Sequence, residues 1–113
     1  MDARFPDVTL DGAEARATVA PAHARALCDG HFPDDPLLPG AYLVELMAAV
    51  GARLLGVDGP PSVIRRCVFH ARVRPAAAID VAARRADAGL VEAWVTADGA
   101  RAAQATLVFE PSA

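Results

Sequence analysis

The sequence predicts an α+β domain in which one long helix is wrapped by a curved antiparallel sheet of about five to six strands. A long apolar run, rich in strong helix formers, occupies residues 40–56. It is too long for a buried strand and is therefore predicted to be helical. The segments after it follow a period of two without an intervening helical pattern, which disfavours a doubly wound parallel sheet.

The strands are placed by alternation and by turn signals. Five segments carry the strand pattern, at residues 14–20, 62–75, 78–87, 90–98 and 100–110. Gly56, followed by the break at 58–61, ends the helix, and Asp98-Gly99 is a strong hairpin signal between the last two strands. We expect a single domain over residues 1–113.

The predicted helix is apolar on every side apart from Glu45 and, near its end, Arg53. A helix of this kind is expected to be buried all round. One small sheet cannot cover the whole helix, so we expect a dimer with a continuous sheet to complete the burial. A single buried helix inside a curved antiparallel sheet describes the hot-dog fold.

Composition narrows the function classes. The chain has 113 residues, is 54% hydrophobic and carries a net charge of −3, so it can bury a core and lacks the basic stripe that nucleic acid requires. No apolar stretch is long enough to span a bilayer, and the first residues carry no secretory pattern. We expect a soluble, cytoplasmic protein in which Cys28 and Cys67 are buried or half-buried thiols rather than metal ligands.

One stretch, residues 30–49, joins a rigid loop to the helix. His31 lies in a segment that contains Pro33, Pro36 and Pro39, and each proline restricts its own φ and the residue before it. A loop held in one shape delivers its histidine to one place, as preorganised catalysis requires. Gly40 follows at the expected helix start, where its N–H is a donor for an oxygen that gains negative charge.

Glu45 is a single carboxylate within the apolar helix. Taken alone, it either reaches solvent at the helix edge or pairs with an arginine such as Arg53 or Arg65, because an unpaired buried carboxylate is costly. Its proximity to a constrained histidine favours a third interpretation, in which the acid and the imidazole divide acid and base roles.

The sequence "GHFPDDPLLPG" followed by "AYLVELMAA" resembles the signature of bacterial 3-hydroxyacyl-acyl-carrier-protein dehydratases of the hot-dog fold. The matching positions are the His-Phe-Pro at 31–33, Pro36 and the Pro-Gly at 39–40. The acid follows the histidine by 14 positions (45 minus 31), which is also the family's spacing. Weaker similarity continues through the later strands.

The resemblance implies a role for each matched residue. His31 resembles the base that removes the proton next to the thioester carbonyl, and Glu45 resembles the acid that assists departure of the β-hydroxyl, the two coming from different subunits of a dimer. The N–H of Gly40 resembles the donor to the thioester carbonyl. The residues expected to line the acyl tunnel are Phe32, Pro39 and Tyr42.

The implied activity is removal of water from a 3-hydroxyacyl thioester, carried on the phosphopantetheine of an acyl carrier protein, to give the trans-2-enoyl thioester. No metal or redox cofactor is expected. Glu45 in place of the Asp of related isomerising enzymes favours plain dehydration. The expected pathway is fatty-acid-like or a secondary lipid, polyketide or aryl-polyene route, and departures from the family pattern, such as Ala49 in place of Gln, suit a specialised route of the latter kind. The alternatives are a hot-dog acyl thioesterase and a non-catalytic acyl-binding subunit of a heteromer.

His70, Trp94 and the strand arginines are expected to lie outside the catalytic site. His70 is expected at a cross-strand or surface position, and Trp94 is expected to pack on the sheet. Most of the strand arginines are expected on the surface, where one or two of them would receive the acidic carrier protein or the pantetheine phosphate. These are Arg65, Arg66, Arg72, Arg74, Arg84 and Arg85.

Overall fold

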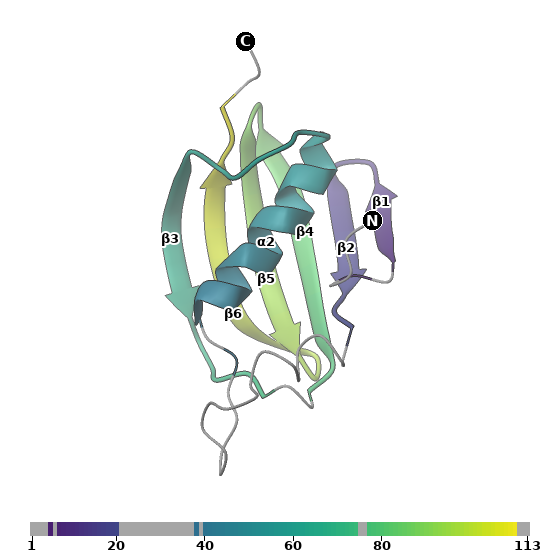
Figure 1. Ribbon diagram of the computed structural model, residues 1–113, viewed down its shortest axis with the longest axis vertical. Coiled ribbons are helices and arrows are strands. Elements are labelled where there is room, and N and C mark those ends of the chain that lie inside the picture. The colour runs from purple at the N-terminus through teal and green to yellow at the C-terminus, as the bar shows by residue number, and fades with distance from the viewer. Residues whose placement is uncertain (1–4, 6, 21–37, 39, 75–76, 111–113) are drawn as a thin grey trace.

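In the part of the chain that the structure describes, one helix lies across one face of a sheet (Figure 1). The computed structural model describes residues 5, 7–20, 38, 40–74 and 77–110. The described elements are β1 (Val8–Asp11), β2 (Glu14–Thr18), α2 (Gly40–Leu55), β3 (Val63–Phe69), β4 (Ile79–Asp87), β5 (Leu90–Ala97) and β6 (Ala100–Val108).

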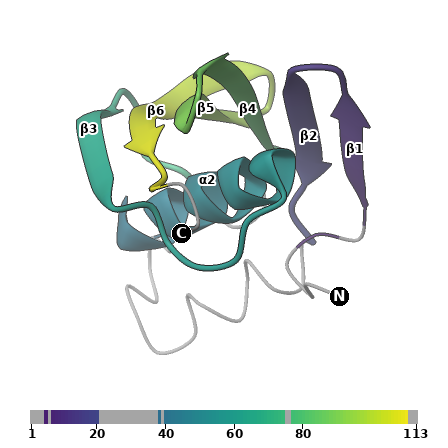
Figure 2. The same cartoon turned by 90° about the horizontal axis from the view of Figure 1, so that it is seen from above.

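The six strands form a sheet of order β1-β2-β4-β5-β6-β3, in which every neighbouring pair is antiparallel. Figure 2 shows the sheet curling around α2, with β3 on one side of the helix and β1 and β2 on the other. The predicted hot-dog architecture is therefore confirmed. Within the described part of the chain, no helix is long and apolar enough to cross a membrane.

Strand β1 is an addition to the predicted set. It pairs with β2 through a turn in which Gly12 has a φ of 59°, with Leu10 opposite Ala15. The Asp11-Gly12 dipeptide at this turn is the same hairpin signal that identifies Asp98-Gly99 near the other end of the chain. That dipeptide is the sequence feature from which β1 can be predicted.

Strand β3 is shorter than the predicted segment 62–75. It contains a bulge between Arg65 and Val68, and Arg66 within it has a φ of 51°. After Phe69 the amides of His70 and Ala71 both donate to the carbonyl of Ala102, at 2.7 and 3.2 Å. Since two successive amides share one acceptor, regular pairing with β6 ends at this point.

The core lies between α2 and the strands β2, β4, β5 and β6. Leu46, Met47 and Val50 of the helix are fully buried against a sheet face that alternates valine or leucine with alanine. Gly51 permits close approach, because a Cβ at this position would lie 3.2 Å from Leu107 Cδ1 and 3.3 Å from Phe109 Cε1. Small residues on both surfaces thus bring the helix close to the sheet.

The expectation that α2 is buried all round is wrong for a single chain. Ala41, Glu45 and Arg53 are exposed, and Ala48 and Ala52 are half-buried. One curved sheet covers only one side of the helix, which leaves a stripe of small side chains around Glu45 facing away from it. The predicted burial of Cys67 is also wrong: its thiol is exposed because β3 is an edge strand.

Candidate functional site

Three of the six predicted site residues lie on the first turns of α2. Gly40 opens the helix, Tyr42 is buried and Glu45 is exposed. The other three predicted residues, His31, Phe32 and Pro39, lie outside the described residues, so their proposed roles stay predictions.

The start of α2 is attached to the segment that follows β3. The amide of Leu38 donates to the carbonyl of Val73 at 2.8 Å, and both residues are buried. Figure 1 shows the first turn of α2 beside the end of β3. This contact fixes where the helix begins, and it therefore fixes the position of the Gly40 amide at the positive end of the helix dipole.

Phe69, the last residue of β3, packs against Gly40. A Cβ built on Gly40 would lie 3.0 Å from Cζ and 3.3 Å from Cε1 of the Phe69 ring. The backbone of Gly40 is helical and needs no glycine, so the ring accounts for the small residue at this position. Phe69 was not among the predicted site residues. It is the only aromatic residue in the predicted strand 62–75, and His70 follows it directly, which is a weak sequence signal of a role at the site.

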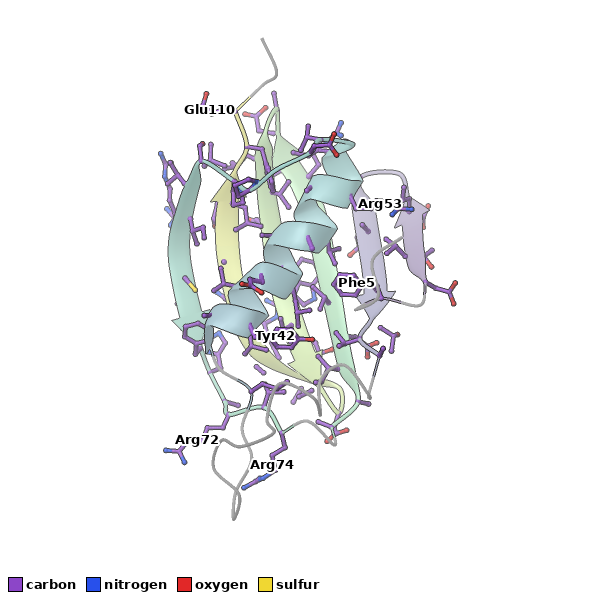
Figure 3. The ribbon with its side chains drawn as sticks, viewed as in Figure 1. Phe5, Tyr42, Arg53, Arg72, Arg74 and Glu110 are labelled. Atoms are coloured by element: carbon purple, nitrogen blue, oxygen red, sulfur yellow. The ribbon has the colours of Figure 1, made fainter. Side chains whose placement is uncertain are left out.

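Glu45 lines a groove of about 390 Å³ between α2 and the segment that contains Phe5 and Val8 of β1. The groove is lined mainly by small and apolar side chains, among them Phe5, Val8, Ala48 and Ala52, with Arg53 further along the helix. Figure 3 shows Arg53 and Phe5 on the same side of the molecule, next to β1 and β2. Within one chain the structure therefore favours the alternative in which Glu45 reaches solvent.

Gly40 and Glu45 do not face the same space within one chain. Five residues of α-helix correspond to a rotation of roughly 140° about the axis (five steps of about 100°) and a rise of about 7.5 Å. Gly40 faces Phe69 of β3, whereas Glu45 faces the groove that Phe5 and Val8 line. Within one chain, Gly40 and Glu45 therefore lie on different sides of α2.

Tyr42 belongs to the hydrophobic core, with 6% of its surface exposed. It packs with Leu43 and Leu46 on the covered side of α2 rather than on the exposed stripe. Its predicted role in lining an acyl tunnel stays a prediction.

The free edge of β3 carries a run of exposed apolar side chains. Ile64 is 43% and Phe69 is 50% exposed, and both point toward the helix side of the sheet because they pair with the buried Leu107 and Ala103. The other free edge, β1, is shorter and offers one such residue, Leu10, between Asp7 and Asp11. Short, acid-flanked edges discourage pairing, whereas long apolar edges favour it. Of the two free edges, β3 thus has the features that favour pairing with another chain, and β1 has those that discourage it.

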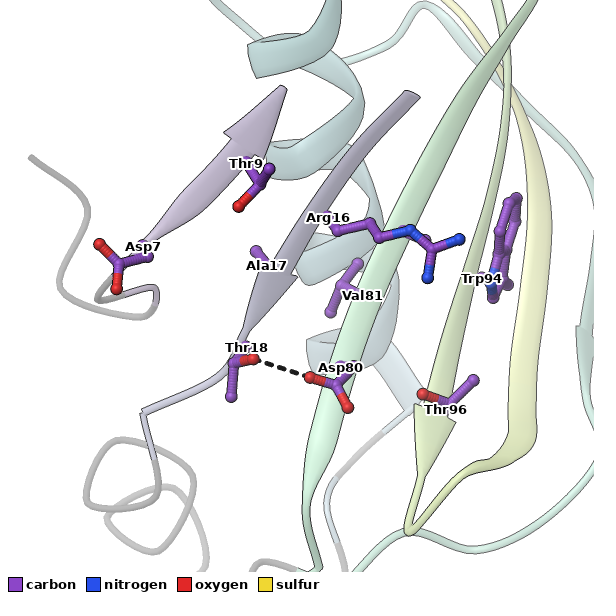
Figure 4. A pocket seen from close by; sticks show the side chains of 10 residues that line it. Asp7, Thr9, Arg16, Ala17, Thr18, Asp80, Val81, Trp94 and Thr96 are labelled. Atoms are coloured by element: carbon purple, nitrogen blue, oxygen red, sulfur yellow. Dashed lines mark hydrogen bonds between the residues drawn. The ribbon is translucent and has the colours of Figure 1, made fainter. Parts of the chain in front are cut away.

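The sheet face opposite α2 has hollows of its own, but several of its polar groups are paired with one another. Figure 4 shows the hollow of about 410 Å³ on this face, with Arg16 reaching toward Trp94 and Thr18 donating to Asp80 at 2.8 Å. Arg16 also pairs with Glu14 at 3.2 Å, and the guanidinium of Arg101 lies 4.9 Å from the centre of the Trp94 ring. Exposed, mutually paired charges of this kind are typical of a solvated sheet face.

The six arginines expected on the surface are all exposed. Arg65, Arg66, Arg84 and Arg85 are exposed on β3 and β4, and Arg72 and Arg74 are exposed beyond the end of β3. His70 is exposed as expected, and Trp94 is half-buried on the outer face of the sheet. Across the described ranges, no group of three or more His, Cys, Asp or Glu side chains is arranged to hold a metal ion.

The described helix and the curved antiparallel sheet around it have the arrangement of a hot-dog domain. The dehydratase heterocomplex ApeI:P from Xenorhabdus doucetiae has the same fold: its TM-score is 0.76 at 20% identity, with 96% of this chain and 97% of that chain covered.

The family follows from the sequence comparison. Residues 7–104 match the ApeI-like family, described as ApeI dehydratase, and the chain belongs to this family. It is 33% identical to a 3-hydroxyacyl-acyl-carrier-protein dehydratase FabZ of Clostridium botulinum, over 72% of this chain and 64% of the relative. It is 30% identical to the FabZ of Ligilactobacillus salivarius, over 94% of this chain and 89% of the relative. The chain thus spans slightly less than two thirds of the length of the C. botulinum relative.

Proposed function

We propose that the protein removes water from a 3-hydroxyacyl thioester on an acyl carrier protein and releases the trans-2-enoyl thioester. The observation that carries the proposal is the position of Glu45, an exposed carboxylate on a stripe of small residues of α2, in a member of the ApeI-like family. Family membership supplies the reaction class, and the free face of the helix supplies access for a substrate.

The proposed reaction is an acid–base elimination. His31 accepts the proton from C2 of the acyl chain, and that electron pair forms the C2–C3 double bond as the C3–O bond breaks. The departing hydroxyl hydrogen-bonds to Glu45, which provides the proton with which it leaves as water. The N–H of Gly40 donates to the thioester carbonyl oxygen as it gains negative charge. The reaction as proposed draws on these groups without a metal or redox cofactor.

The proposed site is completed by a second chain. Gly40 and Glu45 lie on different sides of α2, and the free edge of β3 beside Gly40 exposes apolar residues. Pairing of two β3 edges would extend the sheet across both chains. We propose a homodimer as the basic unit. The heterocomplex named for the Xenorhabdus neighbour favours, as the second candidate, a pair with a related but different chain.

Activity assays test the proposed chemistry directly. The wild type, His31→Ala and Glu45→Gln are incubated with a 3-hydroxyacyl carrier substrate or a short thioester mimic, and enoyl absorbance is followed. We expect turnover by the wild type and a loss of at least about 100-fold in each variant, since a positioned acid or base contributes at least that much. Release of free thiol would favour a thioesterase instead, and activity retained in either variant would contradict the assigned roles.

Mixing the two inactive variants tests the shared site. In a homodimer, His31→Ala and Glu45→Gln chains that exchange subunits form one intact site per mixed dimer, and activity returns. Recovery would reach about half of the wild-type rate per mixed dimer, because one of its two sites carries both substitutions. A mixture that stays inactive although exchange is shown by mass spectrometry would place both residues in one chain.

The carrier protein is proposed to bind at the end of the molecule where α2 begins. Figure 3 shows Arg72 and Arg74 projecting from this end, beyond Tyr42. An acidic carrier would be attracted to these cations and would deliver its pantetheine arm beside Gly40. We expect Arg72→Ala to raise KM for the carrier-bound substrate several-fold and to leave KM for a small mimic unchanged. Arg85→Ala, at an exposed arginine of β4, is the matched control, and equal effects of both variants would contradict this docking site.

A further inference from the structure

The contact between Phe69 and Gly40 carries an inference about substrate choice, which rests on the proposed function. The ring atoms Cζ, Cε1 and Cε2 lie 3.0, 3.3 and 3.4 Å from the place of a Cβ at Gly40. The Phe69 ring therefore occupies the space that a side chain at Gly40 would need. A group that reaches the Gly40 amide from this side of the helix would have the ring as its neighbour.

Phe69 contributes little to the folded core. Its side chain is 50% exposed, and it is not part of the cluster of buried residues that joins α2 to the sheet. An aromatic ring that is half-exposed beside a helix N-terminus is available to contact a ligand. Ile64, on the same side of β3, is also exposed and extends the apolar surface along the strand.

A thioester whose carbonyl binds the Gly40 amide from the β3 side would have its acyl carbons within reach of this ring. The carbonyl oxygen would lie about 2.9 Å from the nitrogen, as in ordinary N–H···O bonds. The carbonyl oxygen is bonded to C1 of the acyl chain, and C1 is bonded to C2. A substituent on C2 directed toward β3 would therefore meet the face or edge of Phe69.

We propose that Phe69 determines the substrate's substitution at C2: its ring admits 3-hydroxyacyl thioesters with an unsubstituted C2 and excludes those with a C2 methyl branch. The ring acts by filling space next to the Gly40 amide. It is thus a specificity residue, and the proton transfers belong to other groups. The same contact explains why residue 40 is a glycine, since even a methyl group there would require the ring to move.

The test compares two substrates on three variants. The kcat/KM values are measured for a 3-hydroxyacyl thioester mimic and for its 2-methyl analogue, with the wild type, Phe69→Leu and Phe69→Ala. We expect the wild type to prefer the unsubstituted substrate and Phe69→Ala to shift the ratio toward the 2-methyl analogue by about 10-fold or more, since one methyl group in an apolar pocket is worth 10–200-fold. Leu10→Ala, at an exposed aliphatic residue of β1, should leave the ratio unchanged.

A second pair of variants tests the steric contact itself. Gly40→Ala should lower kcat/KM for the unsubstituted mimic, and adding Phe69→Ala should restore part of it because the new methyl group then has room. Circular dichroism and light scattering confirm that each variant is folded and has the wild-type oligomeric state, and Phe69→Leu serves if the alanine variant fails either check.

The outcomes separate the two proposals. If the wild type converts the unsubstituted mimic but the substrate ratio is the same in all Phe69 variants, the inference about Phe69 is overturned and the proposed function stands. Additive losses in the Gly40→Ala and Phe69→Ala double variant would likewise overturn it. If the wild type produces no enoyl thioester from either substrate, the proposed function fails, and the inference fails with it.

Discussion

The backbone of Phe109 contacts Gly89 through both its amide and its carbonyl group. The Phe109 amide donates to the Gly89 carbonyl at 2.8 Å, and the Phe109 carbonyl oxygen lies 2.6 Å from the place of a Cβ on Gly89. Gly89 also has a φ of 71°, in the turn that joins β4 to β5. Glycine is therefore required here by conformation and by space at once.

Gly89→Ala is expected to destabilise the protein more than a glycine substitution at an open turn. Gly99→Ala is the control, since Gly99 has a φ of 86° but no atom within 4 Å of its Cβ position. We expect about 1–2 kcal/mol for Gly99→Ala from the left-handed conformation, and about 1–3 kcal/mol more for Gly89→Ala from the backbone contact. Urea unfolding followed by circular dichroism measures both, and equal losses would show that the contact relaxes without cost.

Leu46→Ala should remove a large share of the stability. Leu46 is fully buried between α2 and the sheet, and truncation of such a residue leaves a cavity that typically costs 2–5 kcal/mol. Leu10→Ala makes the same chemical change at a side chain that is 54% exposed, and we expect less than about 1 kcal/mol there. Chemical denaturation of the two variants gives the difference, and similar losses would mean that β1 is covered in solution.

Ile64→Asp should dissociate the proposed dimer without unfolding the chain. Ile64 is 43% exposed on the free edge of β3, so the charge is tolerated in one chain but is costly once a second chain covers it. Leu10→Asp places the same charge on the other edge and should leave the mass unchanged. Multi-angle light scattering reports the mass, and a dimer that survives Ile64→Asp but not Leu10→Asp would place the interface at β1.

Arg101→Ala should have a small but specific effect on the outer face of the sheet. The guanidinium lies 4.9 Å from the Trp94 ring centre, and an exposed cation–π contact of this kind is worth about 0.5–1 kcal/mol. Trp94 is the one tryptophan of the sequence, so its emission should move to longer wavelength as the ring loses its cover. Arg84→Ala, which breaks the exposed pair with Glu92 instead, should leave the emission unchanged.

Much of the fold could be predicted because local patterns specify it. The apolar run at 40–56 and the hairpin signal at Asp98-Gly99 led to elements that the structure confirms within one or two residues. The end of β3 could not be predicted, since residues 70–75 keep a strand-like pattern and only the shared acceptor at Ala102 ends the pairing. The site was predicted by resemblance: Gly40 and Glu45 lie on α2 as expected, and their chemical roles stay predictions.

The hot-dog class, the helix that carries Glu45 and the glycine at its start were all predictable from the amino-acid sequence. These features depend on the periodicity and the residue types of continuous segments, and local interactions are enough to specify them. Three further features follow from the folded chain alone: α2 is covered on one side, β3 is a free apolar edge, and Phe69 lies on Gly40. Each of these depends on how the sheet curves and which strands meet, and Gly40 and Phe69 are brought together across an entire helix and the strand that follows it.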